Sequence, residues 1–161
     1  MTDAIVRLAA PEDESGLMEH ARMLHAENGL GSLSEKKALS RIRMAFDRKG
    51  GIIGVIGPVG ALEGSIYLSL QESYYGDDWQ LLELWNFVAP PRKERAGHAK
   101  KLLEFAKACS DRMKLPLSVG ILSNQRVEAK IRLYERQLEK AGAFFIYNRQ
   151  YAGGSAWNTE G

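Results

Sequence analysis

The chain has 161 residues, of which 45% are hydrophobic and 26% are charged, and its formal net charge is +2. These values suit one soluble domain with a core of its own and exclude a wholly disordered chain. The small net charge gives no reason to expect nucleic acid or a membrane as a partner, and no apolar run approaches the length of a membrane span. The lone Cys109 cannot form an internal disulfide, which, without a signal peptide, favours a cytoplasmic location.

Segments with apolar residues at helical spacing alternate along the chain with short apolar runs that indicate strands. Turns rich in glycine, proline and acidic residues separate these segments. The predicted elements are, in chain order, a strand at 5–9, helices at about 14–28 and 34–49, strands at 52–56, 61–71 and 79–88, a helix at 97–114, a strand at 117–122, a helix at 127–140 and a strand at 143–149.

This order predicts an α/β fold (α+β in its mixed sheet). Three consecutive strands imply antiparallel hairpins, whereas the strand–helix–strand unit around residues 97–114 implies a parallel pair. No repeat or linker divides the sequence. We therefore expect one domain over residues 1–161, with helices on both faces of the sheet and an irregular tail at 150–161.

The beginning of the helix at 97–114 carries the clearest functional pattern. An apolar strand is stopped by Pro90-Pro91, and a turn with Gly97 and Ala99 then enters the helix. The first N–H groups of a helix lack internal partners, the helix dipole adds partial positive charge, and glycine lets an anion approach closely. The alternative is a plain strand–helix connection that needs small residues for tight packing. Cations that could add charge nearby are Lys93, Arg95, Lys100 and Lys101.

The segment FVAPPRKERAGHAKKLL resembles the GNAT superfamily of acyl-CoA N-acyltransferases, whose R/Q-x-x-G-x-G/A turn cradles the coenzyme A pyrophosphate with backbone amides. Gly97 and Ala99 match the two small positions, while Glu94 stands where Arg or Gln is usual. A second segment, SNQRVEAKIRLYERQLEKAGAFFIY, is similar to the family's N-x-x-A-x-x-L-Y-E-K-x-G-F pattern with looser spacing, and includes Asn124 and Tyr134. The resemblance implies a GNAT-like fold whose parallel strands splay apart.

It also implies an N-acetyltransferase that moves an acetyl group from acetyl-CoA to a primary amine by direct attack. The acceptor would be a small molecule or a peptide, no metal would be needed, and a homodimer is left open. Tyr134 would protonate the leaving thiolate; a core tyrosine with its hydroxyl bound to the backbone is the alternative. The residues implied in coenzyme binding are Phe87, Val88, Lys93, Arg95, Ala96, Gly97, His98, Ala99, Lys100 and Asn124.

Glu83 is the candidate general base. Strand alternation predicts that Glu83 shares a face with Trp85 and Phe87, and a carboxylate on a half-buried face has a raised pKa. A chain of waters is the alternative base. Asn124 could instead be a turn or cap residue before the next helix.

The histidines carry less weight, since His98 is expected to point to solvent and His20 to be a surface or helix-packing residue. No cluster of histidines, cysteines and carboxylates has metal-ligand spacing. Basic residues of the helix at 127–140 suggest nucleic-acid binding, but interleaved glutamates favour a solvated face. The alternative to an enzyme is a non-catalytic GNAT-fold module that binds acyl-CoA or a protein.

Overall fold

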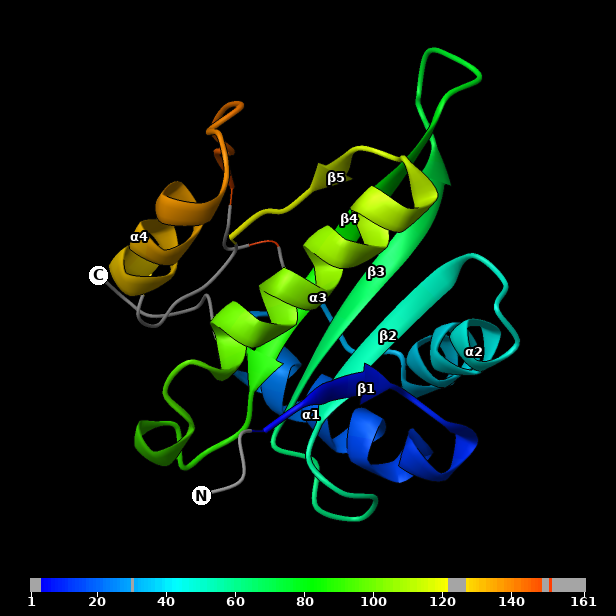
Figure 1. Cartoon of the computed structure of the whole chain (residues 1–161), viewed down its shortest axis with the longest axis vertical. Coiled ribbons are helices and arrows are strands. Elements are labelled where there is room, and N and C mark those ends of the chain that lie inside the picture. The colour runs from blue at the N-terminus through cyan, green and yellow to red at the C-terminus, as the bar shows by residue number, and fades with distance from the viewer. Residues whose placement is uncertain (1–3, 30, 122–126, 149–150, 152–161) are drawn as a thin grey trace. The chain divides into compact units, whose positions relative to one another are not determined.

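The computed structural model describes residues 4–29, 31–121, 127–148 and 151 (Figure 1). It divides into two compact units, which are described separately. Unit 1 comprises Met1–Ala21 and Glu35–Gly120, and unit 2 comprises Arg22–Ser34 and Ile121–Gly161. The expectation of a single domain over the whole chain stays a prediction.

The helices and strands follow the predicted order up to the last helix. They are β1 (Val6–Leu8), the 3-10 turn η1 (Pro11–Asp13), α1 (Glu14–Asn28), α2 (Glu35–Phe46), β2 (Gly51–Ile56), β3 (Gly64–Glu72), β4 (Trp79–Val88), the 3-10 turn η2 (Lys93–Arg95), α3 (His98–Met113), β5 (Leu117–Ser118) and α4 (Val127–Gln137). Within the described residues, no helix is both long and apolar enough to span a membrane.

Two predicted strands differ from the structure. β5 is confined to Leu117–Ser118, and residues 143–148 form no strand. The second prediction was wrong because an aromatic run becomes a strand only where it packs against a sheet, and Phe145 and Tyr147 are 88% and 90% exposed.

The five strands of unit 1 form one mixed sheet in the order β1-β2-β3-β4-β5. Pairing is antiparallel from β1 to β4, and β4 and β5 are parallel. This confirms both the antiparallel hairpins and the parallel pair that the order of elements predicts. The parallel ladder is short, since β5 pairs with β4 only at Leu81 and Leu82.

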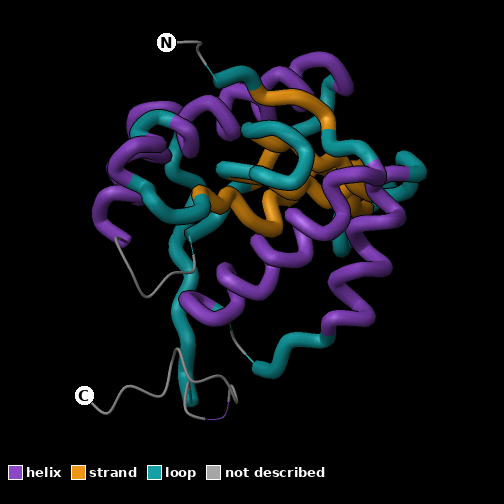
Figure 2. The backbone as a smooth tube through the Cα atoms, turned by 90° about the horizontal axis from the view of Figure 1, so that it is seen from below, coloured by secondary structure: helices purple, strands orange, loops and turns teal. Residues whose placement is uncertain are grey.

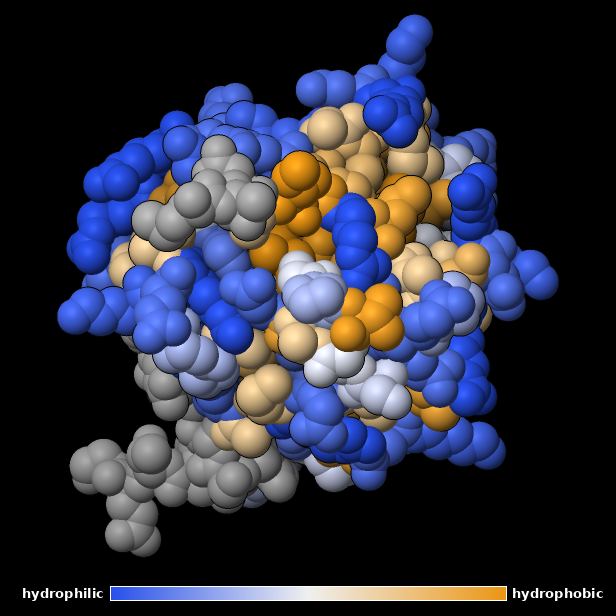
Figure 3. All heavy atoms as spheres, turned by 60° about the horizontal axis from the view of Figure 1, so that its bottom comes forward, coloured by the Kyte–Doolittle hydropathy of each residue, from blue (hydrophilic) through white to orange (hydrophobic). Residues whose placement is uncertain are grey.

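Helices cover both faces of this sheet, and Figure 2 shows the strands as the layer between them. On one face, Leu17 of α1 and Ile42 of α2 pack with Ile53 and Val55 of β2. On the other face, Leu102 and Ala106 of α3 pack with strand residues that include Ile56, Ile66, Leu68 and Leu81. All of these side chains are at most 3% exposed, which places two apolar layers on either side of the strands. Outside these layers the surface is largely polar, with apolar side chains between the polar ones (Figure 3).

A β-bulge in β4 changes which face its side chains occupy. Tyr67 pairs with Trp85, but the next residue, Leu68, pairs with Glu83, so Leu84 has no partner in the register. A bulge of this kind shifts the alternation of the strand by one residue. Glu83 therefore lies on the α3 face with Leu68, whereas Trp85 lies on the α1 and α2 face with Tyr67. The prediction that Glu83 shares a face with Trp85 and Phe87 is wrong, because plain alternation ignores the bulge.

Candidate active site

α3 begins at an exposed glycine in the left-handed conformation. Gly97 is the N-cap residue with φ of 90°, and its backbone oxygen accepts a hydrogen bond from Lys101 N at 3.0 Å. Because glycine has no side chain, it cannot cap the N–H groups of the first turn, which begins at His98. A Cβ atom added at Gly97 would have no described atom within 4 Å. The start of α3 thus combines unpaired backbone donors with room beside them.

The residues around Gly97 differ in how they face this helix start. Lys93, Ala96 and Lys100 are exposed, and Ala99 is half-buried. Glu94 is also exposed, so its carboxylate can stay in water and need not lie against an anion on the helix end. The two lysines are therefore the cations that are free to approach such an anion from solvent.

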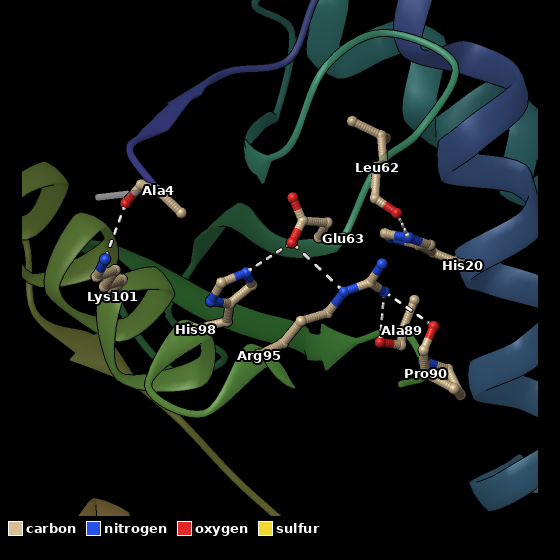
Figure 4. Close-up of polar contacts among 9 residues, drawn as sticks. All are labelled: Ala4, His20, Leu62, Glu63, Ala89, Pro90, Arg95, His98 and Lys101. Carbon is tan, nitrogen blue, oxygen red and sulfur yellow. Dashed lines mark hydrogen bonds and ion pairs between the residues drawn. The ribbon is translucent and has the colours of Figure 1, made fainter. Parts of the chain in front are cut away.

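Arg95 and His98 turn inward toward Glu63, at the entry to β3 (Figure 4). Glu63 Oε1 lies 3.2 Å from His98 Nε2 and 3.4 Å from Arg95 Nε. Arg95 Nη1 also donates to the backbone oxygens of Ala89 and Pro90, at 2.7 and 2.9 Å. These bonds fasten the loop before α3 to the end of β4 and the start of β3.

The expectation that His98 points to solvent is wrong, since this side chain is buried against Glu63 and the residue is only 8% exposed. Turning the ring outward would break its contact with Glu63 and leave the carboxylate with only the longer contact to Arg95. The side chains of His98 and Arg95 are therefore committed to the protein, while the His98 backbone N–H belongs to the helix start.

β4 continues past Leu82, its last position paired with β5, as far as Val88. Over residues 83–88, β4 has one edge that faces β3 and one that faces away from it. We call the edge that faces away from β3 the outer β4 edge. Ala89 N donates to Glu63 O at 2.9 Å, so backbone alternation directs the N–H groups of Val88 and Asn86 to the outer edge. The N–H of Phe87 points to β3 by the same alternation. Val88 O accepts a hydrogen bond from Arg92 Nε at 2.9 Å.

A buried histidine of α1 lies against the face of β4 that carries Phe87, in agreement with the helix-packing alternative drawn from the sequence. His20 is 2% exposed, and its ring stacks edge-on against Phe87 with 5.2 Å between centroids. Its Nδ1 is 2.8 Å from Ser65 Oγ, and its Nε2 is 3.4 Å from Leu62 O. The helical spacing from Leu17 was the available signal, because it places His20 on the apolar stripe of α1.

The hydrogen bonds fix the form of this histidine. A carbonyl oxygen only accepts, so Nε2 carries the proton toward Leu62 and Nδ1 accepts from the Ser65 hydroxyl. Trp85 Nε1 donates to the same hydroxyl at 3.0 Å, which completes a chain from Trp85 through Ser65 to His20. Burial lowers the pKa of His20, because the charged ring would lose its hydration, and the nearby charge of Arg95 lowers it further.

No protein-family model and no curated protein sequence matches the chain. Solved structures do match it. AAC(6')-Iy, in complex with the bisubstrate analogue CoA-S-monomethyl-acetylneamine, superposes with a TM-score of 0.71 over 91% of this chain and 98% of its own, at 11% identity. A predicted acetyltransferase from Clostridium acetobutylicum, solved with acetyl-CoA, gives 0.68 over 91% and 96%, also at 11% identity. The chain has the GNAT acetyltransferase fold.

An integron cassette protein from the Cole Harbour Salt Marsh metagenome is similar too, with a TM-score of 0.67 and 20% identity over 89% of this chain and 88% of that one. These superpositions establish the GNAT fold, and sequence identities this low do not establish the activity. The splayed parallel pair expected from the resemblance agrees with the structure, because β4 extends past the two paired positions of β5.

The other predicted site residues are Tyr134, Glu83 and Asn124. Tyr134 is half-buried in α4 of unit 2, and Glu83 is half-buried in β4. Asn124 lies outside the described residues. Unit 1 brings Val88, Gly97, His98 and Ala99 to the meeting of β4 and α3, where Asn86 Nδ2 donates to Ala99 O at 3.0 Å. Among the described residues, no three His, Cys, Asp or Glu side chains cluster closely enough to hold a metal ion.

Proposed function

We propose that this protein is an acetyl-CoA-dependent N-acetyltransferase that acetylates a primary amine. The proposal rests on one observation, the glycine-led start of α3 beside the outer β4 edge. The start of α3 offers backbone donors and a partial positive charge to the diphosphate of acetyl-CoA. The outer β4 edge offers the N–H groups of Val88 and Asn86 to the amide-bearing arm and the acyl oxygen of acetyl-CoA.

Coenzyme A fits the donor set of unit 1. Its diphosphate would lie on the N–H groups that begin at His98, with Lys93 and Lys100 supplying charge from solvent. Arg95, which sequence reasoning assigned to the coenzyme, would act by holding the loop in place, since its guanidinium already binds Ala89 and Pro90. The imidazole of His98 would act in the same way through Glu63.

In the proposed reaction the neutral amine nitrogen attacks the thioester carbonyl carbon. The N–C bond forms, the C–S bond breaks, and the amine loses a proton while the leaving thiolate gains one, giving an N-acetylated amine and free coenzyme A. Tyr134 is the proposed acid, because a phenol with an ordinary pKa near 10 stays protonated at pH 7. Glu83 is the proposed base, with a chain of waters as the alternative, although the bulge removes one reason for choosing it.

Proteins of similar structure support an amine as the acceptor. One is in complex with an acetylneamine conjugate of coenzyme A, and another is an aminoglycoside acetyltransferase from an uncultured soil sample in complex with trehalose. A third is a ribosomal-protein-alanine N-acetyltransferase from Brucella melitensis. Both small-molecule and peptide amines therefore belong in a substrate screen.

Two measurements test the proposal. Calorimetric titration with coenzyme A measures binding, and release of free thiol from acetyl-CoA across a panel of amines measures turnover. Saturable binding together with amine-dependent thiol release is expected. Binding without release for any amine would instead favour the non-catalytic acyl-CoA-binding module, and no binding at all would contradict both.

A further inference from the structure

Asn86 carries a buried acceptor that the described protein leaves unused. The residue lies in β4 opposite Ile66, on the face of the sheet that packs against α3. Its Nδ2 donates to Ala99 O, in the first turn of α3, at 3.0 Å. Its Oδ1 is buried and has no hydrogen-bond partner among the described residues. A buried polar atom without a partner is uncommon in a native protein and calls for a physical reason.

The orientation of this amide follows from its chemistry. Ala99 O is a carbonyl oxygen and can only accept, so the nitrogen of the Asn86 amide has to face it. Turning the amide around would place two acceptors against each other. Oδ1 of Asn86 is therefore the amide atom that points away from Ala99. Turning the amide around would not give Oδ1 a hydrogen-bond partner.

Asn86 also lies between the two parts of the proposed coenzyme site. Its own backbone N–H points to the outer β4 edge, while its side chain reaches Ala99, two residues after Gly97. A ligand with its diphosphate on the start of α3 and its reactive end on the outer β4 edge has to pass this residue. The segment that joins those two ends in coenzyme A is the pantetheine arm, which contains two amide N–H donors.

We propose that Asn86 Oδ1 accepts a hydrogen bond from an amide N–H of the pantetheine arm. The proposal rests on the proposed function and adds a side-chain contact that belongs to this chain. The two ends of the Asn86 amide then have separate tasks. Nδ2 ties β4 to the first turn of α3, and Oδ1 recognises the arm that runs between them.

The test compares two ligands and two variants. Adenosine 3′-phosphate 5′-diphosphate contains the phosphates of coenzyme A and lacks the pantetheine arm. We expect Asn86→Ala to bind coenzyme A about five- to tenfold more weakly, the effect of one lost hydrogen bond, and to bind the diphosphate fragment as the unchanged protein does. Calorimetric titration measures both affinities.

Asn86→Leu keeps the branched shape of the side chain and adds a second readout. It removes the unpaired oxygen from the ligand-free protein, so the melting temperature without ligand should fall little or not at all, while coenzyme A affinity drops as in Asn86→Ala. An equal loss of affinity for the fragment would show that Asn86 acts only through Ala99, and would overturn the proposal. Unchanged coenzyme A affinity in both variants would overturn it as well.

The unchanged protein separates this inference from the function on which it rests. If that protein binds coenzyme A but the variants show no selective loss, only the role of Asn86 is wrong. If the unchanged protein binds neither ligand, the proposed function fails together with the role of Asn86.

Discussion

The carboxylate of Glu63, at the entry to β3, pairs with the imidazole of His98, the first residue of α3, at 3.2 Å. The two residues are 35 positions apart in the chain. Arg95, in the loop between β4 and α3, contacts the same carboxylate oxygen at 3.4 Å. One acid thus holds both the loop and the helix start to the sheet, so the backbone donors of α3 are positioned from a strand entry that is remote in sequence.

Glu63→Gln should weaken coenzyme A binding. The variant keeps the size of the side chain but removes its charge-assisted contacts with His98 and Arg95, at a cost of about 1 kcal/mol for a partly exposed group. If this loss of about 1 kcal/mol makes the loop less well positioned for the ligand, the affinity for coenzyme A drops about fivefold. Calorimetric titration with coenzyme A measures the change.

The matched control is Glu94→Gln, which removes the same charge from an exposed position in the loop. Loss of an acid near a bound diphosphate should strengthen binding slightly or leave it unchanged. If both variants strengthened binding, Glu63 would act through its charge alone, and its role in positioning the loop would be refuted.

Gly97→Ala should lower both stability and coenzyme A affinity. At φ of 90° an alanine is strained by about 1 kcal/mol, although no described atom lies within 4 Å of the new methyl group. Gly60, in the turn between β2 and β3, has φ of 82° and equally open surroundings. Gly60→Ala should therefore show a similar drop in melting temperature with normal coenzyme A binding. Equal losses of affinity in the two variants would count against an anion site at Gly97.

His20 should make stability fall with acid. Burial holds its pKa in the folded protein below the unfolded value near 6.5, so the unfolded chain binds more protons in this range. The contribution of neutral His20 to the free energy of unfolding is complete above about pH 6.5, and it is lost progressively as pH falls toward the pKa of His20 in the folded protein. Urea unfolding at pH 7.5 and 5.5 should show a smaller pH difference for His20→Gln than for the unchanged protein. The same difference in both proteins would exclude this histidine as the source.

Tyr134→Phe should slow turnover while preserving coenzyme A binding. Loss of a general acid typically costs a factor of about 100 or more in kcat, whereas a purely structural tyrosine would affect stability first. Tyr147→Phe is the control, because that tyrosine is 90% exposed. Thiol-release kinetics give kcat, and thermal unfolding shows whether either variant is destabilised. Unchanged kcat in Tyr134→Phe would remove Tyr134 from the mechanism.

Elements with strong local signals were predicted best. β4 runs from Trp79 to Val88 as expected, because a segment rich in apolar and aromatic residues is bounded by an acidic turn and by Pro90-Pro91. α3 was predicted to within one residue at each end from its apolar stripe and its glycine N-cap. The GNAT resemblance depended on this same part of the chain, where the local pattern and the tertiary structure agree.

The parts that failed depend on partners distant in sequence. Nothing around His98 indicates that Glu63 would lie beside it, and nothing in β4 marks Leu84 as a bulge. Helical spacing alone places Met113 on the same stripe as the buried Leu102 and Ala106, but Met113 is 39% exposed because it is the last residue of α3. Contacts of this kind follow from the register between strands and from the way helices cross them, which periodicity in one segment cannot supply.

The bulge at Leu84 has a consequence for how β4 tolerates change. Upstream of it, odd-numbered residues such as Leu81 face α3; downstream, odd-numbered residues such as Phe87 face α1 and α2. The face to which the odd-numbered side chains of β4 point therefore changes at Leu84. Deleting Leu84 would remove the bulge and leave the flanking side chains on their present faces, because Glu83 and Trp85 already pair with the neighbouring residues Leu68 and Tyr67. Deleting a paired residue such as Asn86 would instead turn the side chains on one side of the deletion to the opposite layer. Loss of one residue is therefore far less disruptive at Leu84 than elsewhere in β4.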